Sequence, residues 1–213
     1  MRMLKARQEV AAHGRKMAEA GLTTRSGGNL SVIDRKQKLV AVSSSGQDYF
    51  DLKPGGVILV DLEGRVAEGS GRPSSELPFH LALYRARPEV GAVVHTHSPY
   101  AATLACLGWE LPPAHYLVGF AGRKVPLAPY RTPGSRELAR VVVEAMEGCN
   151  AVLLANHGLV TVGPSLPLAF TAAESLELAA RVYYQARAVG KPKILGKKQM
   201  DELLPHFARY GRG

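Results

Sequence analysis

Residues 91–100 of the chain are Gly-Ala-Val-Val-His-Thr-His-Ser-Pro-Tyr, a short apolar run that ends in two histidines. Side chains two residues apart on a β-strand point to the same face, about 7 Å from each other. His95 and His97 can therefore close on one metal ion at the end of a strand, where open α/β sheets place their ligands. The same spacing also arises from packing or chance, so the pair alone does not establish a metal site.

Outward from this run, the hydrophobic pattern alternates between strand-like segments and amphipathic helices. We expect helices over residues 3–20, 75–86, 99–107, 135–147 and 167–189, and a last helix that ends near Tyr210. We expect strands over residues 30–33, 38–42, 57–61, 65–68, 91–97, 125–128, 151–155 and 159–162. Ser74 or Ser75 is the predicted N-cap of the second helix and Ser98 that of the third, while residues 108–124 fit no single element.

These elements predict an α/β fold. Successive hairpins favour a mostly antiparallel or mixed central sheet over a purely parallel one. Helices that come before, between and after the strands should cover both faces of that sheet. We therefore expect a three-layer α/β/α sandwich that forms a single domain over residues 1–213.

The composition is that of a globular protein, with 46% hydrophobic and 21% charged residues. No apolar run approaches the ~18 residues of a membrane span, and residues 1–10 lack the apolar core of a signal peptide. The two cysteines, Cys106 and Cys149, form no CxxC pair, so neither a disulfide framework nor a cysteine zinc site is expected. We predict a cytoplasmic protein without a membrane partner.

The net charge of +9 raises the question of a nucleic-acid partner. However, the basic residues are scattered, and no Lys/Arg block is interleaved with aromatic residues. We interpret the charge as a solvated basic surface that favours small anionic substrates, and we expect no nucleic-acid partner.

A third histidine stands apart from the first two. His157 interrupts two apolar strand runs and is flanked by Asn156 and Gly158. Together with His95 and His97 it completes the three-imidazole set of a catalytic zinc that keeps one open position. On its own, His157 is equally typical of a turn residue that bonds to the backbone.

Glu76 is the candidate carboxylate. It falls in the first turn of the predicted helix, where the helix dipole already favours an acid. It could ligate the resting metal or serve as a base beside it. His80, one turn later, could join the ligand set, although a place in the core or a bond to a neighbour is the favoured interpretation.

Three polar segments have the composition of a phosphate site: residues 27–29, residues 43–46, and Ser74-Ser75 at a helix start. Hydroxyls, free backbone N–H groups and helix N-termini are what an anion requires, although each segment alone is also typical of a turn. The nucleotide motif GxxxxGK[ST] and the metalloprotease motif HExxH are both absent.

Taken together, the motifs resemble one family. They are Gly28-Asn29-Leu30-Ser31, Ser45-Gly46, Pro73-Ser74-Ser75-Glu76, Val94-His95-Thr96-His97, Ala114-His115-Tyr116, Asn156-His157-Gly158-Leu159 and Ala208-Arg209-Tyr210-Gly211. In this order they resemble the class II, zinc-dependent aldolases of the fuculose-1-phosphate aldolase type. That family also includes sugar-phosphate epimerases and adducin heads.

The resemblance implies a role for each matched residue. The Zn²⁺ ligands would be His95, His97, His157 and Glu76, and the phosphate site would comprise Gly28, Asn29, Ser45, Gly46, Ser74 and Ser75. Glu76 would also handle the proton at the nucleophilic carbon. Tyr116, supplied by a neighbouring subunit, would act on the aldehyde-derived hydroxyl, and Tyr210 would close over the site. The family forms homotetramers with active sites between subunits.

The activity implied by the resemblance is cleavage of a ketose 1-phosphate to dihydroxyacetone phosphate and a short aldehyde, through an enediolate that zinc stabilises as a Lewis acid. Sibling reactions are 4-epimerisation, dehydration and decarboxylation, and a non-catalytic module of the adducin-head type would be expected to lack metal ligands. Glu76 resembles the aldolases, because the epimerase branch carries Asp there. Pro133 departs from the fuculose-type pattern, which has an aromatic residue at that turn, and this leaves the aldehyde open.

Overall fold

The computed structural model describes residues 1–209 and arranges them around an eight-stranded sheet. The strands are β1 (Asn29–Asp34), β2 (Leu39–Val42), β3 (Ile58–Asp61), β4 (Val66–Glu68), β5 (Ala92–Thr96), β6 (Leu127–Ala128), β7 (Ala151–Leu154) and β8 (Gly158–Gly163). The α-helices are α1 (Leu4–Glu19), α2 (Leu77–Ala86), α3 (Pro99–Cys106), α4 (Arg136–Ala145), α5 (Leu166–Val189) and α6 (Lys197–Arg209). Two 3₁₀ turns, η1 (Pro54–Gly56) and η2 (Tyr116–Phe120), complete the elements.

The sheet has the strand order β4-β3-β2-β1-β5-β8-β7-β6. Every neighbouring pair is antiparallel except β6 and β7, which are parallel. The predicted mostly antiparallel, mixed sheet is therefore confirmed. Strand β5, which carries the His-x-His segment, lies in the middle of the sheet, between β1 and β8.

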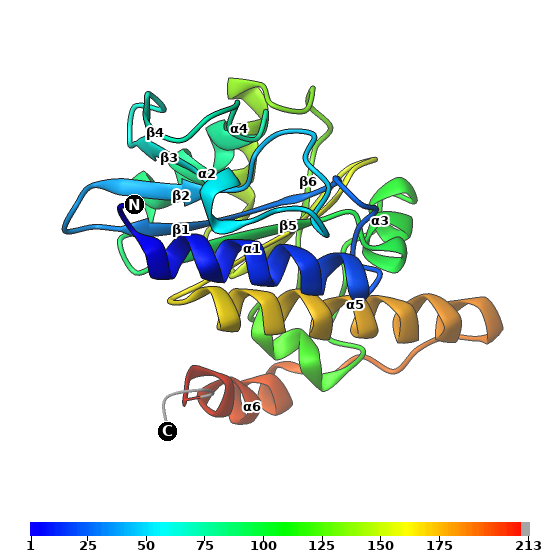
Figure 1. Cartoon of the computed structure of the whole chain (residues 1–213). Coiled ribbons are helices and arrows are strands. Elements are labelled where there is room, and N and C mark those ends of the chain that lie inside the picture. The colour runs from blue at the N-terminus through cyan, green and yellow to red at the C-terminus, as the bar shows by residue number, and fades with distance from the viewer. Residues whose placement is uncertain (210–213) are drawn as a thin grey trace.

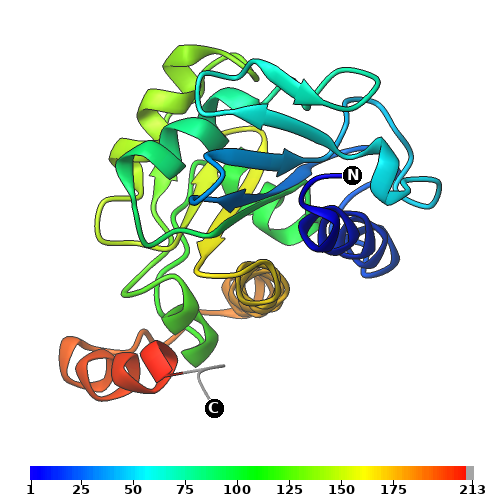
Figure 2. The same cartoon turned by 60° about the vertical axis from the view of Figure 1, so that its left-hand side comes forward.

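Helices cover both faces of the sheet. Helices α2 and α4 pack on one face, and α1, α5 and α3 pack on the other (Figures 1 and 2). Alternation along β5 sorts its side chains between the two layers: Val93 joins the α2/α4 core, whereas Ala92 and Val94 join the α1/α5 core. The three-layer α/β/α sandwich is confirmed, and the period of two places His95 on the α2 side.

The start of α2 differs from the prediction. The helix begins at Leu77, its N-cap residue is Glu76, and no side chain caps it there. The predicted cap by Ser74 or Ser75 is wrong, because Ser74 is tied to the neighbouring loop by a bond from its N–H to the carbonyl of Ser43 (3.1 Å). Its hydroxyl instead accepts the N–H of Glu76 (3.2 Å), which turns the chain just before the helix.

The predicted strand 125–128 is shorter than expected. Only Leu127–Ala128 joins the sheet, as edge strand β6, and Val125 forms an isolated bridge with Leu111. Pro126 has no N–H to donate to a ladder, which accounts for the interruption. The unplaced residues 108–124 contain η2.

Helix α6 packs against η2, away from the sheet layers (Figure 1). The ring of Phe207 lies against Gly119, where a Cβ would come 2.4 Å from it. The predicted helix end near Tyr210 lies outside the described residues. Within residues 1–209, no helix is long and apolar enough to cross a membrane.

Candidate metal centre

Four side chains gather at the end of β5: Glu76, His95, His97 and His157. One candidate ligand atom from each lies within 4.8 Å of all the others. They come from the N-cap of α2, from the end of β5, and from the turn between β7 and β8. The fold thus brings together the four residues that the sequence resemblance implies as metal ligands.

The hydrogen bond of His95 determines which of its ring nitrogens faces the cluster. Its Nδ1 lies 3.0 Å from the carbonyl oxygen of Leu159, which can only accept, so Nδ1 carries the hydrogen. The Nε2 atom is then left with a free lone pair, which is the tautomer that a metal-binding histidine requires.

The distances around that atom match a metal polyhedron. His95 Nε2 lies 3.0 Å from His97 Nε2, 3.2 Å from His157 Nε2 and 3.1 Å from Glu76 Oε2. Tetrahedral zinc with bonds of about 2.05 Å would place its ligand atoms about 3.4 Å apart. These three distances are slightly shorter than that, and all four ligand atoms lie within 4.8 Å of one another, so this donor set can close on a metal ion.

The cluster holds its ligands in the protonation states that a cation needs. Burial, reinforced by the charges of neighbouring histidines, lowers the pKa of His97 and of His157 to about 4. Both rings are therefore neutral near pH 7. Burial by itself would raise the pKa of the Glu76 carboxyl, but the neighbouring His95 and His157 and the hydrogen bond from Asn29 lower it well below its usual range.

One carboxylate oxygen in the cluster lacks a hydrogen bond. Glu76 Oε1 is buried and has no hydrogen-bond partner among the described residues; its neighbour is His157 Nε2 at 3.4 Å. Leaving a buried charged acceptor unpaired costs at least about 1–3 kcal/mol. A cation among the three imidazoles would remove that cost, which is a second sign that the site fits a metal.

The three polar segments meet beside this cluster. An isolated bridge joins Ser44 to Pro73, and the N–H of Ser45 donates to the carbonyl of Arg72 (2.9 Å), so residues 43–46 and 72–75 lie together. The carbonyl of Gly28 accepts the hydroxyl of Tyr49 (2.9 Å), which also reaches the hydroxyl of Ser43 (3.4 Å). Three loops that are distant in sequence therefore form one rim.

Gly28 is required by that rim. Its φ is +64°, in the left-handed region, and a Cβ there would lie 2.4 Å from the carbonyl oxygen of His95. The rim also contains residues that are not buried, namely Ser45, Gly46 and Ser75, whereas Ser74 and Asn29 are buried. The Asn29 amide donates to Glu76 Oε2 (2.9 Å).

The two tyrosines are placed differently. Tyr116 lies on η2, is 55% exposed, and contacts the rings of His115 and Phe207, so it does not join the Glu/His cluster of its own chain. Tyr210 lies outside the described residues.

Behind Glu76 lies a hydrogen-bonded group around His80; the favoured interpretation of His80 as a core residue bonded to a neighbour is confirmed, but its partners were not identified from the sequence. His80 is fully buried and bonds to Asn29 and Ser31, and Ser31 bonds to Tyr84. The spacing carried a signal: Asn29 and Ser31 are i and i+2 on one strand, and His80 and Tyr84 are i and i+4 on one helix.

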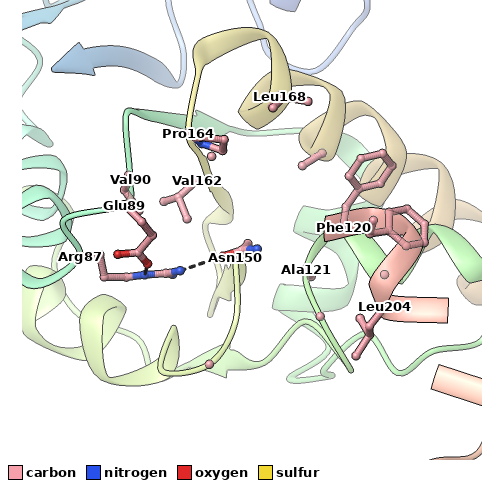
Figure 3. Close-up of a pocket in the computed structure, with 16 residues that line it drawn as sticks. Arg87, Glu89, Val90, Phe120, Ala121, Asn150, Val162, Pro164, Leu168 and Leu204 are labelled. Carbon is pink, nitrogen blue, oxygen red and sulfur yellow. Dashed lines mark hydrogen bonds and ion pairs between the residues drawn. The ribbon is translucent and has the colours of Figure 1, made fainter. Parts of the chain in front are cut away.

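A separate cavity of about 430 Å³ lies at the opposite end of β5 (Figure 3). Arg87, Val90 and Asn150 line it, and Arg87 is engaged by Glu89 and Asn150. None of the predicted site residues within 1–209 lines this cavity, so the predicted chemistry belongs to the Glu/His cluster.

The fold is an α/β/α sandwich whose four-residue cluster could hold a metal ion, and comparison with known proteins identifies the family. The pattern of the "Class II Aldolase and Adducin N-terminal domain" family matches residues 8–184. A 5-deoxy-D-ribulose 1-phosphate aldolase of Bacillus thuringiensis serovar kurstaki is 48% identical over 212 residues, covering 100% of both chains. An L-fuculose phosphate aldolase of Haemophilus influenzae is 37% identical and covers 92% of this chain and 90% of its own.

A solved structure of an L-fuculose 1-phosphate aldolase superposes with a TM-score of 0.93, at 41% identity and 96% coverage of each chain. The chain therefore belongs to the class II aldolase family. The prediction of a class II aldolase, a carbon–carbon lyase, is confirmed.

Proposed function

We propose that the protein is a zinc-dependent aldolase that cleaves a ketose 1-phosphate into dihydroxyacetone phosphate and a short aldehyde. The observation that carries the proposal is the Glu/His cluster with the three-loop rim beside it. Such a cluster supplies a metal position, and the rim supplies hydroxyls and N–H groups for a phosphate.

His95, His97, His157 and Glu76 would hold the ion in the resting enzyme. Three histidines and a carboxylate are borderline ligands that suit zinc. When bound, zinc supplies a Lewis acid that polarises the substrate carbonyl and stabilises negative charge on its oxygens. The phosphate would bind to Gly28, Asn29, Ser45, Gly46, Ser74 and Ser75, which fixes the distance from phosphate to cluster.

Glu76 would serve as the acid/base. Its Oε2 is occupied by Asn29, whereas its Oε1 has no hydrogen-bond partner among residues 1–209. In the cleavage direction, the carboxyl at Oε1 would return a proton to the carbon that becomes the hydroxymethyl carbon of dihydroxyacetone phosphate. In the synthetic direction the same oxygen would remove that proton.

The remaining roles depend on assembly. We propose a homotetramer in which Tyr116 of a neighbouring subunit serves the aldehyde-derived hydroxyl and Tyr210 closes over the site. The exposure of Tyr116 in the single chain supports this assignment. We also propose that residues 1–213 form one domain of a cytoplasmic enzyme, since the two cysteines are unpaired.

For the substrate we propose a 5-deoxypentulose 1-phosphate, such as 5-deoxyribulose 1-phosphate. Cleavage between C3 and C4 leaves dihydroxyacetone phosphate and the two-carbon acetaldehyde, whereas a 6-deoxyhexulose 1-phosphate leaves three-carbon lactaldehyde. The name of the 48%-identical relative supports the smaller aldehyde. Pro133 stands where the fuculose type has an aromatic residue, so the resemblance to that type does not extend to this turn.

The test compares kcat/KM for 5-deoxyribulose 1-phosphate and fuculose 1-phosphate, with dihydroxyacetone phosphate as the measured product. We expect the pentulose to be the better substrate. One additional carbon and hydroxyl in a small pocket changes kcat/KM by about 10- to 200-fold. A preference for fuculose 1-phosphate would refute the substrate assignment, and an absence of cleavage of either compound would refute the activity.

A further inference from the structure

A line of hydrogen bonds runs through the protein interior and ends on Glu76. Its links are Tyr84 Oη to Ser31 Oγ (2.7 Å), Ser31 Oγ to His80 Nδ1 (2.7 Å), His80 Nε2 to Asn29 Oδ1 (2.5 Å) and Asn29 Nδ2 to Glu76 Oε2 (2.9 Å). None of the five residues is more than 6% exposed. A polar chain this deeply buried is costly unless every member is satisfied.

The carboxylate sets the direction of the first two links. Ionised Glu76 can only accept, so Asn29 must present its NH₂ group to it. The carbonyl oxygen of the same amide then faces His80 and also only accepts. His80 Nε2 must therefore carry a hydrogen.

The remaining links follow from His80. Burial, with a smaller effect of the neighbouring His95, lowers the pKa of His80 to about 3 even though the Glu76 carboxylate acts to raise it, so the ring carries one hydrogen near pH 7. With Nε2 protonated, Nδ1 is an acceptor and the Ser31 hydroxyl donates to it. Ser31 has no second hydrogen, so Tyr84 donates to Ser31. Burial raises the pKa of Tyr84, which keeps that donor in place.

We propose that His80 is a positioning residue that holds the Asn29 amide with its NH₂ group towards Glu76. One oxygen of the Glu76 carboxylate is then fixed by a hydrogen bond, and the other is left for proton transfer. Oε2 is held by Asn29 and lies 3.1 Å from His95 Nε2, whereas Oε1, 3.4 Å from His157 Nε2, has no hydrogen bond among the described residues. The effect on catalysis rests on the proposed role of Glu76 as acid/base. The direction of each hydrogen bond from Tyr84 to Glu76 rests only on contacts within this chain.

The lock matters because an amide has two nearly identical orientations. With Asn29 flipped, its carbonyl oxygen would face the carboxylate, and two acceptors would meet in a buried site. Glu76 would then rotate away, and displacements of about 1 Å can cost roughly 100-fold in rate. A ring nitrogen that can only donate, aimed at Asn29 Oδ1, excludes the flip.

The first test measures the His80 tautomer in the metal-free full chain by ¹⁵N–¹H NMR of the ring nitrogens at pH 7.5. The His80 signal is the one lost in His80→Gln and retained in His13→Gln, a histidine whose ring bonds its own helix backbone. We expect a neutral ring protonated at Nε2. A ring protonated at Nδ1, or at both nitrogens, would overturn the proposal.

The second test uses two variants of His80 whose amide side chains differ in length. The side-chain amide introduced by His80→Gln can occupy the Nε2 position and still donate to Asn29, whereas the shorter amide introduced by His80→Asn reaches only the Nδ1 position. Per metal-loaded molecule, we expect His80→Asn to lower kcat about 10- to 100-fold, more than any change in KM, and His80→Gln to retain most of kcat. Tyr84→Phe should have a smaller effect, because it removes only the first donor.

The opposing results are distinct. If both His80 variants lose thermal stability alike, yet keep wild-type kcat per folded, metal-loaded molecule, then His80 is only structural and the proposal fails. If wild-type protein cleaves no ketose 1-phosphate, the proposed function fails. The tautomer measurement on metal-free protein still tests the donor order in that case.

Discussion

At the residue scale, the two oxygens of Glu76 have different surroundings. Oε2 accepts from Asn29 and lies 3.1 Å from His95 Nε2, while Oε1 has no hydrogen-bond partner among residues 1–209. A carboxylate that is fixed at one oxygen and open at the other suits a proton-transfer role beside a metal. Glu76 therefore provides a direct test of the chemistry.

Glu76→Gln should lower turnover by about 10²- to 10⁴-fold, because an amide cannot accept and return the proton. Metal content, measured by mass spectrometry, should fall only in part, since three histidines remain. Glu137→Gln, an exposed change of the same type on α4, is the matched control. Wild-type turnover in metal-loaded Glu76→Gln would remove Glu76 from the mechanism.

The buried His80 predicts acid sensitivity of the folded state. The unfolded chain binds a proton here near pH 6.5, whereas the folded chain does so only near pH 3. Between these values the unfolded state holds more protons, so the free energy of unfolding falls as the pH drops below about 6.5. The slope from this one group approaches about 1.4 kcal/mol per pH unit.

Urea unfolding of the metal-free protein between pH 7.5 and 5 measures this slope. His80→Gln should lower the slope by about 1.4 kcal/mol per pH unit, which corresponds to one proton fewer taken up on unfolding. An unchanged slope in that variant would show that His80 is not the titrating group.

At the element scale, the end of β5 is enclosed by close backbone contacts from both neighbouring strands. A Cβ at Gly28 would lie 2.4 Å from the His95 carbonyl, and one at Gly158 would lie 2.2 Å from the Thr96 carbonyl. The two glycines allow β1 and the β7–β8 turn to approach β5. That approach brings Asn29 and His157 to the cluster.

The β7–β8 turn yields a prediction about Asn156, whose φ is +55°. Glycine adopts this left-handed conformation freely, but a β-branched residue is strained there by about 1–2 kcal/mol. Asn156→Gly should keep both stability and metal affinity, whereas Asn156→Val should lose stability and weaken metal binding through His157. Thermal unfolding and metal titration measure the two effects, and equal behaviour of the variants would contradict the turn's role.

Much of this element-level structure was predictable from the sequence. Short apolar runs bounded by polar turns located β1, β2, β5, β7 and β8, because most residues of these strands are buried. The start of α2 was not predictable, because Ser74 resembles a helix cap while its N–H pairs with Ser43, which is 31 positions earlier in the chain. A tertiary contact overrode the local signal.

At the scale of the whole molecule, the strand order assembles the site. Residues 27–29 lead into β1, residues 43–46 follow β2, and β5 lies beside β1, so the three-loop rim and the histidines share one end of the sheet. The sequence pattern indicated each polar loop separately. It did not contain the strand order, and neither the meeting of the loops nor the bonds from His80 to Asn29 could be derived from it.

The exposed Tyr116 supports a prediction about assembly. Analytical ultracentrifugation should show a tetramer, and Tyr116→Phe should lower kcat by about 10- to 100-fold with unchanged metal content, because it removes a proton-transferring hydroxyl. Tyr130→Phe, which alters another exposed tyrosine, is the control. A fully active monomer would exclude a site shared between subunits.

The central claim is that a metal held by His95, His97, His157 and Glu76 supports aldol cleavage. The most direct test is release of dihydroxyacetone phosphate from 5-deoxyribulose 1-phosphate before chelation, after chelation, and after zinc is restored. We predict that cleavage disappears with the chelator and returns with zinc. Cleavage that survives complete metal removal, or epimerisation of ribulose 5-phosphate without any aldol cleavage, would contradict the claim.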